Sequence, residues 1–279
     1  MASQSHLRFS VNHITVPHRD IAGLAALTRE LGFRDVEIRN DVAGEPLADG
    51  TPGAEAKAML EAGGVAPLTV NALQRFNEWN DTRAAEAEAL AAETAASGAP
   101  ALVLCPVNVD GWRSGAGERE TSLREALAAL KPILARHGLK GFVEPLGFPI
   151  SSLRYKRDAV EAIDAVDGAD TFLLVHDTFH HAIAEDPDLF PDRTGLIHVS
   201  GVSTAEGLAF DEMLDAHRIL VDEDDALRSP EQIAALVAGG YRGPISFECF
   251  AASVHDDPAI GQSIARSVSL IENAVATTL

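Results

Sequence analysis

The chain has 279 residues, 46% of them hydrophobic, and a formal net charge of −20 at pH 7. This length suits one domain, which we expect to span residues 1–279. The acidic charge argues against a nucleic-acid-binding protein, because binding a phosphate backbone requires a basic surface. Apolar runs too short to cross a bilayer, and a start without a signal-peptide pattern, predict a cytoplasmic protein that does not bind membranes. Cys105 and Cys249 lie in apolar strand-like runs, so we expect buried free thiols.

Strand-like and helix-like segments alternate along the chain. The predicted strands lie near residues 8–14, 35–39, 65–71, 101–106, 141–144, 171–177, 196–198 and 245–248. The predicted helices lie near residues 21–31, 55–62, 82–97, 118–137, 156–166, 230–238 and 258–277. The longer predicted loops are rich in Gly and Pro at 43–53, polar and aromatic at 71–80, and acidic at 211–225.

This alternation predicts a (β/α)8 TIM barrel, a fold that needs about 250 residues. A doubly wound open sheet is the alternative. It is disfavoured because no Gly-x-Gly-x-x-Gly motif follows the first predicted strand. Polar residues also follow many different strands, and closure into a barrel is what would bring those strand ends together.

Four predicted strands end on a side chain that can bind a metal: Glu144, Asp177, His198 and Glu248. Any one of them alone would be better explained as a solvated residue, a helix cap or a satisfied core histidine. In a barrel, however, the carboxyl ends of all the strands surround one mouth. The four together therefore predict a site for one divalent metal ion (Mn, Co, Mg or Zn) with oxygen and nitrogen ligands.

Other polar residues are expected beside this site. His180 lies three residues after Asp177, where it can orient that carboxylate or hold a substrate. Arg39, Asn71 and Arg218 are candidate hydrogen-bond partners of a substrate, with surface ion pairs or loop bracing as equally weighted alternatives. His176 precedes Asp177 in an extended segment and should point to the opposite face, which favours a structural role.

The sequence resembles the xylose isomerase-like TIM barrels of the sugar phosphate isomerase and epimerase superfamily, and within it the bacterial inosose isomerases, which interconvert keto-inositols. The matching segments are residues 36–39, 71–73 with 76–77, 143–144, 177–180, 197–198 and 246–250. The resemblance implies that the four strand-end residues are the metal ligands and that Glu144 and Glu248 also form the acid–base pair. It places His180 and Arg218 near the substrate. The chain departs from the family after His198, where an acidic residue is common, and at residues 221–225, which replace a Gly-rich turn.

The chemistry that fits is isomerisation or epimerisation of a keto-polyol or ketose, with two glutamates moving protons through a metal-stabilised enediolate. An inosose dehydratase-like lyase on the same fold is the alternative, and a non-catalytic barrel is less favoured. An AP-endonuclease-like role would need more metal ligands and a basic DNA-binding face. The expected partner is a small polyol or keto-sugar, and homo-oligomerisation is left open.

Overall fold

A computed structural model of the protein, which describes residues 7–42 and 50–278, shows eight parallel strands closed into a barrel. The strands pair in chain order and β8 pairs in parallel with β1, with Phe9 opposite Ile245. This pairing confirms the predicted TIM barrel, and the open-sheet alternative is wrong. Residues 43–49 of the predicted loop 43–53 lie outside the described residues. No helix among the described residues is long and apolar enough to cross a membrane.

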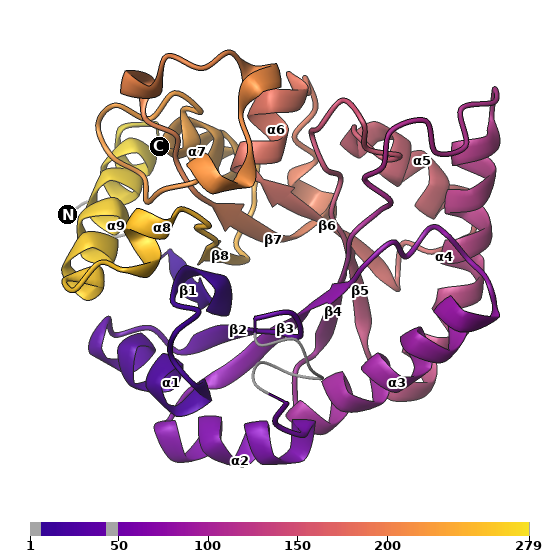
Figure 1. Ribbon diagram of the computed structural model, residues 1–279, viewed down its shortest axis with the longest axis horizontal. Coiled ribbons are helices and arrows are strands. Elements are labelled where there is room, and N and C mark those ends of the chain that lie inside the picture. The colour runs from indigo at the N-terminus through magenta and orange to yellow at the C-terminus, as the bar shows by residue number, and fades with distance from the viewer. Residues whose placement is uncertain (1–6, 43–49, 279) are drawn as a thin grey trace.

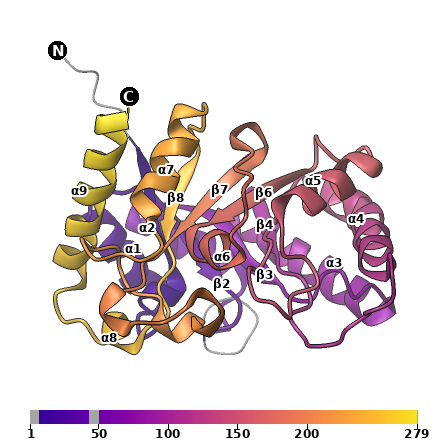
Figure 2. The same cartoon turned by 90° about the horizontal axis from the view of Figure 1, so that it is seen from above.

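The helices form a ring around the strands (Figures 1 and 2). The strands are β1 Arg8–Asn12, β2 Asp35–Arg39, β3 Ala66–Leu73, β4 Ala101–Leu104, β5 Lys140–Val143, β6 Phe172–Asp177, β7 Thr194–Val199 and β8 Pro244–Phe247. The helices are α1 Ile21–Glu30, α2 Gly53–Gly63, α3 Asp81–Ser97, α4 Glu118–His137, α5 Lys156–Ala165, α6 Thr178–Ala184, α7 Ser229–Ala238, α8 Ala252–His255 and α9 Ile260–Thr278.

Two short helices at the carboxyl ends of strands were not predicted. Helix α6 begins directly after β6 because the side chain of Asp177 accepts the backbone N–H of His180 and caps the helix. Helix α8 follows β8 after a few residues. Figure 2 shows α8 and the segment between β7 and α7 at the same end of the barrel. The loops that carry the candidate site are therefore gathered at one end.

Side chains along each strand alternate between the helix-covered outer face and the interior of the barrel. In β2, Val36 and Ile38 belong to the large apolar cluster formed with the helices. A second, smaller cluster of strand residues is separate from it and comprises Leu68, Ala72, Ala101, Val103, Cys105, Phe142, Val175 and Leu196. Both cysteines are buried free thiols, as predicted.

Gly147, in the segment between β5 and α5, allows a close approach that shapes the site. A side chain here would overlap the carbonyl oxygen of His180 and the side chain of Ile183. We therefore expect Gly147→Ala to lower the free energy of unfolding by about 1–3 kcal/mol, as overpacking of a close contact does. Urea denaturation measures the change. In the control Gly261→Ala, the added methyl lies 3.4 Å from its nearest neighbour, Glu30 Oε1, and should cost nothing. Equal losses in the two variants would contradict the expectation.

Candidate metal and substrate site

The carboxyl ends of β5 to β8 bring the four predicted ligands together. Glu144 directly follows β5, Asp177 ends β6, His198 lies in β7 and Glu248 directly follows β8. One ligand atom from each lies within 4.8 Å of all the others, and all four residues are buried. Three carboxylate oxygens and one imidazole nitrogen suit Mn, Mg, Co or Zn. The residues present therefore fit a single divalent ion.

His198 turns one ring nitrogen toward the other ligands. Its Nδ1 lies 2.7 Å from Glu144 Oε1, 3.3 Å from Glu248 Oε2 and 3.9 Å from Asp177 Oδ2. Burial opposes a positive charge on the ring, but the surrounding carboxylates of Glu248, Glu37 and Glu144 outweigh it. They raise the pKa of His198 well above its ordinary value of 6.5. Without a cation, this histidine is held as imidazolium.

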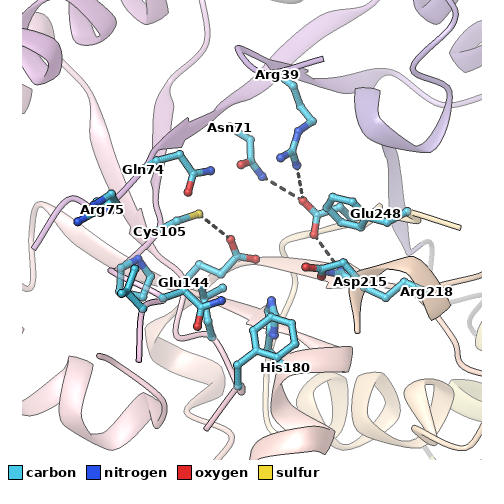
Figure 3. Close-up of a pocket in the computed structure, with 16 residues that line it drawn as sticks. Arg39, Asn71, Gln74, Arg75, Cys105, Glu144, His180, Asp215, Arg218 and Glu248 are labelled. Carbon is cyan, nitrogen blue, oxygen red and sulfur yellow. Dashed lines mark hydrogen bonds and ion pairs between the residues drawn. The ribbon is translucent and has the colours of Figure 1, made fainter. Parts of the chain in front are cut away.

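Glu248 is held by two arginines and by Asn71 (Figure 3). Arg39 Nη1 lies 2.8 Å from Glu248 Oε1, and Arg218 Nη2 lies 2.9 Å from Glu248 Oε2 and 2.6 Å from Asp177 Oδ2. Asn71 Nδ2 donates to Glu248 Oε1 at 3.2 Å. Burial opposes the charge on Glu248, but His198 and the two arginines prevail and hold its pKa far below 4.5. Arg39, Asn71 and Arg218 are buried, so they are not the surface groups of the alternative interpretation.

Glu144 has different neighbours from Glu248. Its Oε1 faces His198, and its Oε2 lies 3.2 Å from the thiol of Cys105, which donates to it. Burial and the adjacent Glu144 carboxylate raise the pKa of Cys105, so the thiol keeps its proton. In the part of the chain that the structure describes, no lysine or arginine lies within ion-pair distance of Glu144. The two glutamates of the site are thus held by different groups.

His180 lies beside the ligands with a free ring nitrogen. Its ring is packed edge-on between Phe148 and Phe179, with centroid distances of 5.1 and 5.2 Å. The residue is buried, and among residues 7–42 and 50–278 its Nδ1 has no hydrogen-bond partner. His176 lies on the outer face as predicted, where its Nε2 is 2.9 Å from Gln232 Oε1.

A cavity of about 300 Å³ opens onto this cluster. Its lining includes every residue predicted to touch a substrate or move a proton: Arg39, Asn71, Glu144, His180, Arg218 and Glu248. Asp177 and His198 do not line it. The two glutamates are therefore the ligands that a small molecule in the cavity can reach.

The family model for the xylose isomerase-like TIM barrel matches residues 25–270. The chain belongs to this family. A xylose isomerase domain-containing protein from Salmonella typhimurium LT2 is 32% identical, with a TM-score of 0.88 over 97% of this chain and 99% of that one. IolI, solved with a zinc atom, is 18% identical, with a TM-score of 0.81 over 98% and 99% of the two chains. D-Psicose 3-epimerase from Clostridium cellulolyticum H10 is 15% identical, with a TM-score of 0.67 over 98% and 96%. No curated protein matches this sequence.

Three side chains at the site of this xylose isomerase-like barrel were missed in the sequence. Asn12 donates through Nδ2 to Glu248 Oε1 at 3.2 Å, Cys105 contacts Glu144, and Glu37 lies next to His198. The signal for Glu37 was present: charged and apolar residues alternate strictly from Asp35 to Arg39. Such alternation places all the charged residues on one face of the strand. No comparable signal marks Cys105, which stands in an apolar run.

The raised pKa of His198 makes the stability of the metal-free barrel depend on pH. A group whose pKa is higher in the folded than in the unfolded state stabilises fully below the unfolded value and loses that contribution as the pH rises through the folded value. With a chelator present, the free energy of unfolding should therefore decline from pH 6.5 upward. Urea denaturation across that range measures it. The decline should flatten in His198→Gln, and an equal slope in both proteins would contradict this account.

Proposed function

We propose that the protein is a metal-dependent isomerase or epimerase of a small keto-polyol or ketose. The observation that carries the proposal is that Glu144 and Glu248 belong to the buried ligand cluster and also line the cavity. Carboxylates that both bind a cation and face the cavity can exchange protons with a substrate held beside that cation. The family membership supports the proposal, as do the folds of the D-psicose and L-ribulose 3-epimerases, which this chain shares.

The reaction starts with removal of a proton from the carbon next to the carbonyl group. Glu144, Asp177, His198 and Glu248 would hold a divalent ion, which would stabilise the negative charge that develops on the carbonyl oxygen. Glu144 is the better first proton acceptor, because it lacks the two arginines that hold Glu248 as a weakly basic carboxylate. Glu248 faces the same cavity and is placed to pass a second proton, taken up from solvent, to the carbon, while Glu144 releases the first proton to solvent.

Four further side chains are placed to bind the hydroxyl groups of the substrate. His180 lines the cavity with its ring, which is held between Phe148 and Phe179. Arg39, Asn71 and Arg218 line the same cavity while they hold Glu248 and Asp177. A polyol carries many hydroxyl groups that can donate and accept hydrogen bonds, and these polar side chains can serve as their partners. The cavity also has apolar wall residues, Pro106, Val109, Leu146 and Phe148, which suit the C–H surface of such a molecule.

The proposed chemistry predicts hydrogen exchange with solvent. With Mn²⁺ and a panel of keto-inositols and ketoses in deuterated water, the protein should place deuterium on the carbon next to the carbonyl, as NMR and mass spectrometry detect. Glu144→Gln should slow this exchange by about 10²- to 10⁴-fold, the usual contribution of a general base. Glu248→Gln should abolish net conversion. Circular dichroism checks that both variants fold. Absence of exchange across the whole panel rejects the proposal, and a product that has lost water identifies a dehydratase instead.

Metal removal should abolish the reaction and lower stability. Dialysis against a chelator is expected to stop deuterium exchange, and Mn²⁺ should restore it and raise the melting temperature, because a ligand that binds only the folded state stabilises it. Binding must displace the proton from His198 Nδ1, so the metal affinity should increase as the pH rises from 6.5 toward the raised pKa. Calorimetric titrations in buffers of different ionisation enthalpy measure the released proton. No thermal shift with any of Mn²⁺, Co²⁺, Mg²⁺ and Zn²⁺ would favour a non-catalytic barrel.

A further inference from the structure

Glu37 is a fully buried carboxylate inside the barrel. It lies in the middle of β2, with Val36 and Ile38 facing the helices on either side of it in the sequence. Its exposed fraction is 0%. Both of its oxygens approach one atom of the site, with Oε1 at 3.1 Å and Oε2 at 3.2 Å from His198 Nε2. Glu37 therefore contacts the edge of the imidazole ring opposite to the ligand cluster.

The other hydrogen bonds of Glu37 fix its side chain in place. Thr69 Oγ1 donates to Oε2 at 2.5 Å, and Asn12 Nδ2 donates to Oε1 at 3.3 Å. Each oxygen thus accepts a hydrogen bond from a neighbouring strand in addition to the one from His198. Asn12 also donates to Glu248, so it joins Glu37 to the ligand cluster by a second route. A carboxylate held from three sides has one orientation.

From this geometry we infer that Glu37 is a positioning residue for His198: it keeps the proton on Nε2 and so presents Nδ1 as the nitrogen that binds the cation. The inference rests on the metal site of the proposed function. A neutral imidazole can carry its proton on either nitrogen, and the hydrogen bond made by one nitrogen decides which is free to bind metal. A carboxylate at this place also makes the ligand more basic and orients its ring.

A purely structural role explains Glu37 less well. A buried carboxylate is normally paired with a cation, and the place of that cation in the fold indicates what the carboxylate does. Two residues earlier on the same face of β2, Asp35 is paired in this way with Arg8 at 2.6 Å. Glu37, by contrast, forms no ion pair with a lysine or arginine in the described part of the chain, and its charged partner is His198 alone. The charge of Glu37 therefore acts on a predicted metal ligand, His198.

The pair Glu37 and Asp35 provides a matched test. Glu37→Gln keeps the size of the side chain and removes the charge, and Asp35→Asn makes the same change two residues away on the same face of β2. Titration calorimetry with Zn²⁺ on the whole 279-residue chain should show about 10- to 100-fold weaker binding for Glu37→Gln, the usual effect of removing a hydrogen-bond partner of a metal-binding histidine. Asp35→Asn should bind Zn²⁺ like the wild type, although it loses its ion pair with Arg8.

Histidine tautomers give a readout that a change in stability alone would not alter. In the Zn²⁺-loaded, ¹⁵N-labelled wild type, NMR should show His198 with a hydrogen-bonded proton on Nε2 and no proton on Nδ1. The resonances of His198 are assigned as those absent from the spectrum of His198→Gln. That proton resonance should move upfield in Glu37→Gln, because a neutral amide is a weaker acceptor than a carboxylate. If Glu37→Gln does not fold, Thr69→Val, which removes one hydrogen bond to Glu37, should still weaken Zn²⁺ binding several-fold.

The outcomes separate the two proposals. Equal Zn²⁺ affinity in Glu37→Gln and the wild type, or metal bound through His198 Nε2, overturns the role of Glu37 and leaves the metal-dependent function standing. If the wild type and Asp35→Asn also fail to bind Zn²⁺, the metal site itself is wrong, and the inference about Glu37 is wrong with it.

Discussion

The balance of charge inside one end of the barrel is the constraint on which the site depends. Four carboxylates are buried there: Glu37, Glu144, Asp177 and Glu248. Two buried guanidinium groups, those of Arg39 and Arg218, face them. With a neutral His198, these buried groups carry a net charge of −2, which one divalent cation would cancel. Uncompensated charge in a protein interior is very unfavourable. The raised pKa of His198 is the response of the metal-free protein to this excess.

Much of the fold and part of the candidate site could be predicted, because both follow from local patterns. Alternating strand-like and helix-like segments indicate a barrel, and an apolar run that stops at an acidic residue or a histidine marks the mouth. Glu37 escaped notice because it stands within a strand rather than at its end. Its alternation with Val36 and Ile38 was visible, but only closure of the barrel shows that the polar face of β2 points inward.

Arg218 illustrates a second limit of the sequence. It lies in the long segment between β7 and α7, where no spacing rule relates it to Asp177 or Glu248. The segment folds back on itself through two backbone hydrogen bonds between Gly201 and Ile219, at 2.7 and 2.8 Å. This contact places Arg218 over the mouth, where Nη2 reaches both carboxylates. The partner that fixes the arginine is therefore distant in sequence and is recognisable only in three dimensions.

The segment that carries Arg218 lies outside the barrel strands, so the wall of the cavity and the strand scaffold can change independently in evolution. It contains only short 3₁₀ turns between β7 and α7, and it adds no strand to the barrel. Mutations, insertions or deletions there can shift the arginine and reshape the wall above the carboxylates while the eight strands stay as they are. Under the proposed function, new substrate preferences can therefore arise in this segment while the strands that carry the four ligands are kept.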